Sequence, residues 1–140
     1  MIILDTHVIS EAIKPEPNAA VLAWLDQQSS KTLYLTTVTI AEMGFEIGAL
    51  PDGKRKLKLK DALQGILELF DGKILPFDLT AAQHYADLAV KARSLGKGFP
   101  VPDGYIAAIA AARDYIVASR DVSAFYASGV DVIDPWKNQT

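Results

Sequence analysis

The sequence contains no cysteine. This absence excludes disulfide bonds, thiolate metal ligands and cysteine nucleophiles, and it fits a reducing cytoplasm. Only two histidines are present, so the usual nitrogen and sulfur ligands of a zinc site are scarce. No apolar run approaches the roughly 20 residues of a membrane-spanning helix. Residues 1–5 lack the basic region of a signal peptide, and we expect a cytoplasmic protein without membrane association.

The sequence also lacks a surplus of basic residues, because its formal net charge is −3. That balance argues against binding nucleic acid by electrostatic attraction alone. It leaves open a nucleic-acid enzyme whose acidic residues hold a cation. With 140 residues, of which 50% are hydrophobic, the chain is long enough to bury a proper core. We expect a single domain over residues 1–140.

The most informative stretch runs from Pro102 to Asp121. Residues 102–113 are predicted to form a helix, because proline followed by an acid is typical of a helix start. The alanines and isoleucines of this helix are apolar nearly all round, so it should be buried. Residues 115–118 then predict a buried parallel strand, and Asp121 follows just past its end. A buried helix has no packing reason to begin with an acid, so Asp103 needs another explanation.

The rest of the chain alternates short strands with helices. We expect further strands at residues 1–4, 32–36, 73–77 and 130–133. Helices are expected after Thr6, from the N-cap Asn18, from Thr37 or Thr39 to Leu50, over residues 57–70, from the cap Thr80, and for one turn over residues 122–126. This alternation predicts an α/β fold, a three-layer α/β/α sandwich around a central, mostly parallel sheet.

Four acids fall at the carboxyl ends of the expected strands, where such sheets place their sites. They are Asp5, Glu42, Asp103 and Asp121. Taken singly, each has an ordinary structural interpretation as a turn residue, a solvated helix residue, a helix-start acid or a cap. Together they are harder to dismiss, because two like charges about 4 Å apart cost on the order of 4 kcal/mol at an effective dielectric near 20.

A cluster of carboxylates therefore predicts a neutralising cation. Oxygen ligands favour a hard ion, Mg²⁺ or Mn²⁺. Such an ion commonly keeps several waters, and one of these can become a nucleophile while the metal stabilises charge on a phosphoryl oxygen. The convergence of the four acids is at this point a prediction from the fold.

The segments around these acids resemble a known family. They are Leu4-Asp5-Thr6, Glu42 after Thr-Val-Thr-Ile-Ala, Pro102-Asp103-Gly104-Tyr105-Ile106-Ala107-Ala108, and Ala118-Ser119-Arg120-Asp121. In order and spacing they are similar to a PIN-domain ribonuclease, of the VapC type found in bacterial toxin–antitoxin pairs. The opening Ile-Leu-Asp-Thr-x-Val-Ile-Ser-Glu and the closing Asp-Pro-Trp are most similar to the FitB branch. The resemblance covers essentially the whole chain.

The resemblance implies a metal-dependent endoribonuclease that hydrolyses RNA phosphodiester bonds. Family acids matching Asp5, Glu42, Asp103 and Asp121 form a Mg²⁺ or Mn²⁺ site. A hydroxyl residue matching Ser119 supports the last acid, and Thr6 matches the polar residue after the first. The chain departs from the family at His7, where asparagine is usual. An imidazole there can still donate a hydrogen bond, but its charge titrates near neutral pH.

The resemblance also implies partners. These are a small antitoxin, usually a DNA-binding dimer with a tail that occupies the toxin's groove, and a second copy of the toxin. DNA is then contacted only through the antitoxin. We expect the antitoxin on the apolar helix pair at residues 40–50 and 57–70, with Leu57 among the side chains facing the core.

Several other residues have two interpretations each. The basic run Lys54, Arg55, Lys56, Lys58 and Lys60 is either a solvated helix face or a contact for phosphates. Arg120 either steadies a phosphate or pairs with an acid, and Glu11 is either an outer support of the site or a partner for an arginine of another protein. The aromatic side chains are expected to pack in the interior, namely Trp24, Phe45, Tyr85 and Trp136.

Two rival functions remain at this stage. One is a catalytically silent PIN-like module that binds RNA or a partner, for which His7 is the only support. The other is a DNA-directed nuclease related to the flap nucleases, for which the chain is short. A Mn²⁺ titration together with an RNA cleavage assay distinguishes the silent module from a ribonuclease. Comparing cleavage of matched RNA and DNA oligonucleotides distinguishes the DNA-directed nuclease from a ribonuclease.

Overall fold

The computed structural model describes residues 1–98 and 101–137. Five short parallel strands form one sheet in the order β3-β2-β1-β4-β5. The strands are β1 Ile2–Leu4, β2 Leu33–Thr36, β3 Ile74–Leu75, β4 Ile116–Ala118 and β5 Val132–Ile133. The connecting helices are α1 Thr6–Ala12, α2 Ala19–Gln27, α3 Thr37–Gly48, α4 Lys54–Leu69, α5 Leu79–Ser94, α6 Val101–Arg113 and α7 Val122–Ala127, with short 3₁₀ turns η1 Ser30–Thr32 and η2 Pro135–Lys137.

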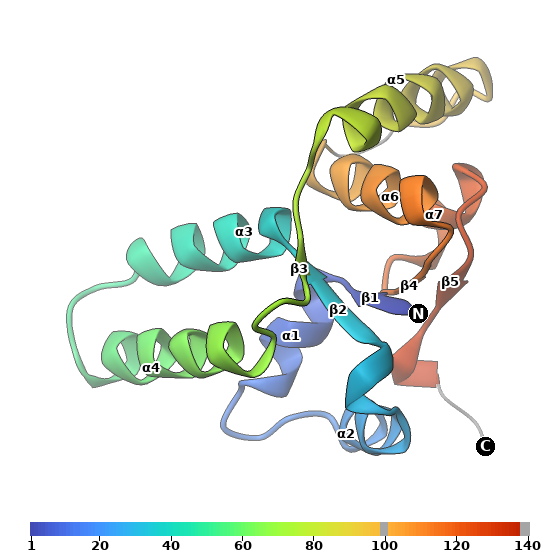
Figure 1. The fold of residues 1–140 in the computed structure, drawn as a ribbon. Coiled ribbons are helices and arrows are strands. Elements are labelled where there is room, and N and C mark those ends of the chain that lie inside the picture. The colour runs from blue at the N-terminus through green and yellow to red at the C-terminus, as the bar shows by residue number, and fades with distance from the viewer. Residues whose placement is uncertain (99–100, 138–140) are drawn as a thin grey trace.

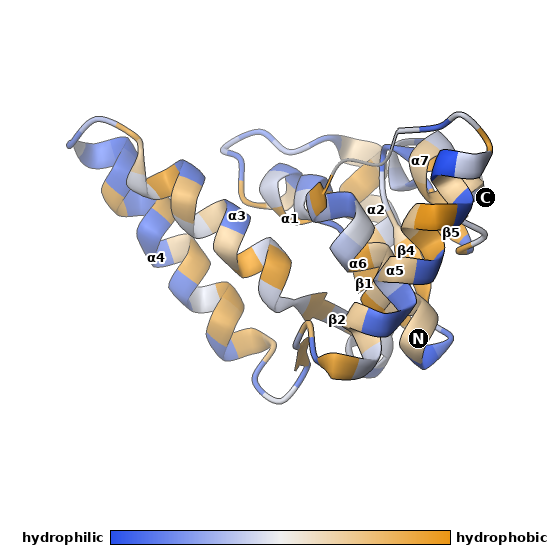
Figure 2. Ribbon diagram, turned by 90° about the horizontal axis from the view of Figure 1, so that it is seen from above, coloured by the Kyte–Doolittle hydropathy of each residue, from blue (hydrophilic) through white to orange (hydrophobic). Residues whose placement is uncertain are grey.

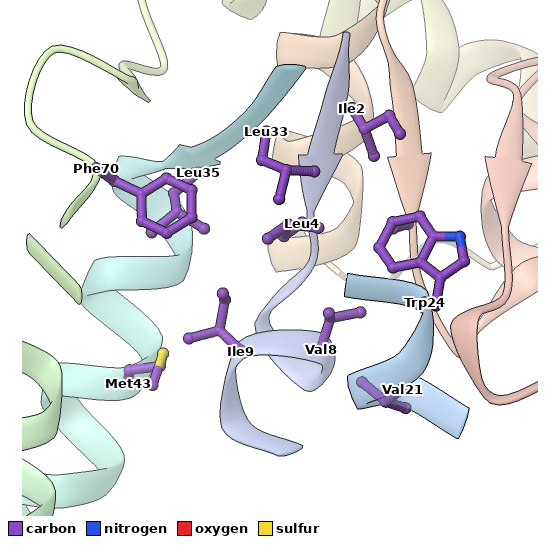
Figure 3. Packing of buried hydrophobic residues seen from close by; sticks show 11 residues of the cluster. Ile2, Leu4, Val8, Ile9, Val21, Trp24, Leu33, Leu35, Met43 and Phe70 are labelled. Carbon is purple, nitrogen blue, oxygen red and sulfur yellow. The ribbon is translucent and has the colours of Figure 1, made fainter. Parts of the chain in front are cut away.

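The sheet is covered on both faces, which confirms the predicted α/β/α sandwich. Helices α5 and α6 lie on one side of it, and α1 and α2 lie on the other (Figure 1). Alternate residues of β1 point to opposite faces, as the period of a strand requires. Ile2 and Leu4 pack with Val21 and Trp24 of α2 (Figure 3), whereas Ile3 packs with Ile106 and the rest of the α6 face.

Helix α6 confirms the prediction of a buried helix behind the sheet. Ile106, Ile109 and Ala110 are at most 1% exposed, because α5 and the sheet enclose them. The first described residue of the helix is Val101, so Asp103 lies in the first turn. The predicted domain of residues 1–140 includes residues 99–100 and 138–140, which lie outside the described residues.

Helices α3 and α4 form a hairpin that projects from the sheet beside α1 (Figure 2). This position corrects two predictions. Leu57 does not face the core and is 63% exposed, and Phe45 is not a packing residue but is 77% exposed. Helix α4 has no buried residue at all, because within the described residues only α3 covers it closely. The apolar stripe of α4 therefore lacks a full partner in the described part of the chain.

The helix caps follow the predicted chemistry but not always the predicted residue. Asn18 caps α2 as expected. Helix α3 is capped by Thr36, whose hydroxyl accepts from the Thr39 amide, and α5 is capped by Asp78 rather than Thr80. Each true cap lies one to three residues earlier, where the backbone is still extended and its side chain can reach the free amides of the first turn.

Among the described residues, no helix is both long and apolar enough to cross a membrane.

Candidate active site

Asp5 is the most buried acid of the candidate site, at 1% exposure. It ends β1 and caps α1, and its Oδ1 accepts from the Thr6 amide at 2.5 Å. Its own amide donates to the Ala118 carbonyl of the neighbouring strand at 3.0 Å. The pairing of β1 with β4 therefore fixes Asp5 next to the loop that follows β4.

Ser119 links Asp5 to the loop that carries Asp121. Its hydroxyl donates to Asp5 Oδ2 at 2.5 Å and accepts from the Asp121 amide at 3.0 Å. Ser119 is fully buried. Asp121 precedes α7, but its side chain makes no capping hydrogen bond to that helix. Its interpretation as a simple cap is therefore wrong.

Two threonines connect Glu42 to the same centre. The Thr6 hydroxyl donates to Glu42 Oε1 at 2.7 Å and lies 3.0 Å from the Thr39 hydroxyl. Thr6 and Thr39 are both buried, so this contact fixes the direction of Glu42 from α3 toward α1. Sequence reasoning considered Thr39 only as a cap and missed this role. The available signal was spacing, because Thr39 and Glu42 are three residues apart and so share one helix face.

Asp103 interacts electrostatically with the other three acids of the candidate site. Burial, the largest cause, and the neighbouring carboxylates of Asp5, Asp121 and Glu42 together raise the pKa of Asp103 to about 6. Among the described residues, no lysine or arginine forms an ion pair with any of the four acids. The fold thus brings the four predicted acids into one region of negative charge, which no lysine or arginine of the described residues balances by an ion pair.

Within the described part of the chain, His7 is the basic side chain that forms an ion-pair contact with one of the four acids. Its Nδ1 lies 3.7 Å from Asp5 Oδ2, and its side chain is 63% exposed. Interaction with Asp5 raises the pKa of His7 above its ordinary value, burial opposes that shift, and the charges of Asp103 and Glu42 add to it. His7 therefore senses three of the four acids and carries a positive charge over a wider range of pH than a free histidine.

The donor set fits a hard divalent cation. The described residues hold no group of three His, Asp or Glu side chains gathered closely enough to form a ready-made metal cage. Mg²⁺ does not require one, because it is usually bound through one or two carboxylates and keeps several waters. The carboxylates of Asp5, Asp121 and Glu42 contribute to the raised pKa of Asp103, and this negative charge favours a cation beside them.

Arg120 and Glu11 have structural partners of their own. The Arg120 guanidinium lies 5.1 Å from the centre of the Trp136 ring. Glu11 is buried, binds Lys14 at 2.9 Å and accepts from the Asn18 amide at 3.0 Å. These two contacts lower the pKa of Glu11. Glu11 thus joins the end of α1 to the start of α2.

The comparisons with known proteins agree with this architecture. The family model described as "PIN domain" matches residues 2–127. The chain therefore belongs to the PIN-domain family. The sequence motifs predicted this class, and the five-stranded parallel sheet agrees with it.

Individual relatives match almost the entire chain. The chain is 50% identical over 138 residues to the VapC ribonuclease Y4jK of Sinorhizobium fredii, covering 98% of this chain and 99% of that protein. It is 45% identical over 137 residues to Toxin FitB of Neisseria gonorrhoeae, covering 97% and 99%. A solved structure of FitAB bound to a DNA fragment matches with a TM-score of 0.94 and 44% identity, over 100% of this chain and 99% of that one.

Proposed function

We propose that this protein is a Mg²⁺- or Mn²⁺-dependent endoribonuclease that acts as the toxin of a toxin–antitoxin pair. The observation that carries the proposal is the convergence of Asp5, Glu42, Asp103 and Asp121 on one unbalanced negative region. Relatives over nearly the full chain that are named as a VapC ribonuclease and a toxin support it. Since the proposed substrate is RNA and the proposed partner is an antitoxin, the proposal includes action in the cytoplasm.

In this scheme the four acids hold the cation directly or through water. Ser119 and Thr6 are positioning residues, because their hydroxyls hold Asp5 and Glu42 in place. When bound, the divalent ion supplies Lewis-acid activation of water and of a phosphoryl oxygen. The buried hydrogen bonds keep the carboxylates from turning away when the ion is absent, so little reorganisation is needed on binding.

Asp5→Asn tests the catalytic part of the proposal. The variant keeps the shape of the side chain but removes its charge. We expect the rate of RNA cleavage in Mn²⁺ to fall by at least about 100-fold, because mutation of the residues that merely support metal ligands already lowers metal affinity or activity about 10- to 100-fold. Asp26→Asn on the exposed side of α2 is the matched control. Full activity of the Asp5→Asn variant would reject the scheme, and cleavage of matched DNA as fast as RNA would reject the substrate.

The alternative is a catalytically silent module that binds RNA or a partner. The observation that favours it is His7, which brings an imidazole into contact with Asp5. A calorimetric titration with Mn²⁺ beside the RNA cleavage assay distinguishes the two. Metal binding with cleavage supports the nuclease, whereas a protein that binds RNA but neither binds Mn²⁺ nor cleaves is the silent module.

The proposed partners are an antitoxin and a second copy of the chain, with DNA bound through the antitoxin. The solved FitAB complex with DNA supports an assembly of this kind. We place the antitoxin on the α3–α4 hairpin, where Phe45 and Leu57 are exposed. The double variant Phe45→Ser, Leu57→Ser should weaken binding of the antitoxin encoded by the neighbouring reading frame, whereas Tyr126→Ser on α7 should not. Unchanged affinity in the double variant would exclude this location.

We also propose that residues 1–140 form one PIN domain. The family model ends at residue 127. Beyond it, Val132–Ile133 adds β5 to the edge of β4, and the turn Pro135–Lys137 packs on α2. Limited proteolysis should leave the chain intact as one resistant core, and a stable fragment ending near residue 127 would contradict the proposal.

A further inference from the structure

A groove runs between the end of α1 and the α3–α4 hairpin. Its larger part has a volume of about 520 Å³ and its smaller part about 240 Å³. The two parts share Ile13, Lys14, Arg55 and Leu59 in their walls, so they form one continuous depression. Residues from the first turns of α4 line it, and these turns are hydrophilic and lie beside α3 (Figure 2).

The larger part of the groove is lined by cations and by apolar groups only. Its charged residues are Lys14, Lys54, Arg55 and Lys58, and no acid lines it. Lys14 pairs with Glu11 at 2.9 Å, but the other three form no ion pair with a described acid. In a chain with a net charge of −3, this is a local concentration of positive charge.

The structure divides the basic run of α4 into two groups. Lys56 is turned to another side, where its Nζ contacts the Gly48 carbonyl at 3.1 Å and Asp52 at 3.3 Å. Lys60 lines a different cavity, together with Gly44 and Leu63. Only Lys54, Arg55 and Lys58 face the groove. The two interpretations of the basic run, a phosphate contact and a solvated face, therefore apply separately to the residues that face the groove and to those that do not.

The groove also leads to the acids. Its smaller part is lined by Ser10 of α1 and by Glu46 of α3. Ser10 lies one helical turn after Thr6, and Glu46 lies one turn after Glu42, which is about 5.4 Å along each helix. The smaller part of the groove therefore ends about one helical turn from Thr6 and Glu42 of the candidate site.

We propose that this groove binds the phosphate backbone of the RNA strand beside the bond to be cut. The inference rests on the proposed ribonuclease function and extends it to a substrate-binding surface. A strand that crosses the acid centre carries a regular series of negative charges, and cations on two walls match such a series. Ile13, Pro15 and Leu59 provide apolar surface for the bases. An acidic peptide is the competing occupant, but it does not carry a charge at every step.

The test is binding of a fluorescein-labelled single-stranded RNA of random sequence to the full chain. Ca²⁺ is used in place of Mg²⁺ or Mn²⁺, and the fluorescence anisotropy of the RNA is measured at several salt concentrations. The double variant Arg55→Ala, Lys58→Ala should weaken binding about 10-fold at 150 mM salt and reduce the slope of log K against log salt by about 1.4, since each phosphate contact on a single strand contributes about 0.7. Lys60→Ala, on the same helix, should change the affinity less than twofold.

The outcomes separate this inference from the proposed function. If the wild type cleaves RNA and the double variant keeps its KM and salt slope, the groove is not the RNA track, although the nuclease stands. If the wild type does not cleave RNA, and RNA affinity and salt slope fall in the double variant but not in Lys60→Ala, the groove stands and the catalytic proposal falls. Equal losses in the double variant and in Lys60→Ala, or loss of binding to an acidic peptide alone, would overturn the inference.

Discussion

The Ser119 hydroxyl donates a 2.5 Å hydrogen bond to Asp5 Oδ2, although 114 residues separate the two in the chain. The bond forms because β1 and β4 are neighbours in the sheet, so that the residues after both strands lie side by side. The same hydroxyl accepts from the Asp121 amide. One buried side chain thereby ties the loops of two acids to each other.

Ser119→Ala should weaken both the fold and the metal site. The variant leaves the Asp5 carboxylate and the Asp121 amide without their partner, and we expect a loss of about 1–3 kcal/mol in the free energy of unfolding. Mn²⁺ affinity should fall about 10-fold, as for other partners of metal ligands. Urea denaturation and calorimetry measure the two effects. Ser128→Ala is the control, because that hydroxyl is also buried but binds the Phe125 carbonyl instead. A similar loss of Mn²⁺ affinity in both variants would contradict the assigned role.

Thr6→Val should lower metal affinity with little change in packing. Valine has nearly the shape of threonine but cannot donate to Glu42 Oε1, so Glu42 is free to turn away. We expect Mn²⁺ affinity to fall about 10-fold, whereas Thr6→Ser, which keeps the hydroxyl, should stay within about threefold. Equal affinities in the two variants would show that the hydroxyl does not position Glu42.

Asp103→Asn should stabilise the metal-free protein at high pH. The pKa of Asp103 is raised to about 6 from an unfolded value of 3.8, so the protonated carboxyl is favoured by folding. This contribution is fully present below about pH 4 and is lost as the pH rises through about 6. At pH 8 the amide should therefore add about 1–2 kcal/mol to the free energy of unfolding, less than the full pKa change implies because solvent screens part of the charge.

Urea denaturation at pH 5 and pH 8 without divalent ions measures this effect. The gain of the Asp103→Asn variant should be larger at pH 8 than at pH 5. Asp87→Asn, on an exposed part of α5, provides the control and should show no such difference. A gain that grows toward pH 5 would have the wrong sign and would contradict the electrostatic description of the site.

His7→Asn should make metal binding less dependent on pH. The hydrogen bond to Asp5 raises the pKa of His7 above its ordinary value, so at pH 6 the imidazole is protonated and repels a cation near Asp5, and this repulsion weakens as the pH rises. We expect the loss of Mn²⁺ affinity from pH 8 to pH 6 to be about 3- to 10-fold smaller in the variant. His84→Asn on α5 is the matched control. Asp103 titrates in all three proteins, so only the difference between them reports on His7.

The sequence was a reliable guide where the signal was local. Asn18 was predicted as a cap because its side chain can reach amides within its own helix turn. The alanine-rich helix and the strand after it were predicted because burial leaves a continuous apolar run. The caps Thr36 and Asp78 were missed by one to three residues, since several hydroxyl and acid residues are adjacent and only the backbone geometry selects between them.

The sequence by itself determined the order of strands and helices, the placement of acids at strand ends and the family to which the chain belongs. The tertiary structure decided which side chains touch: that Thr39 and Thr6 meet, that Lys58 faces a groove while Lys56 does not, and that Leu57 stays exposed. The physical reason is that periodicity is set along the chain, whereas a contact across it depends on how strands align and on which helix faces find a partner.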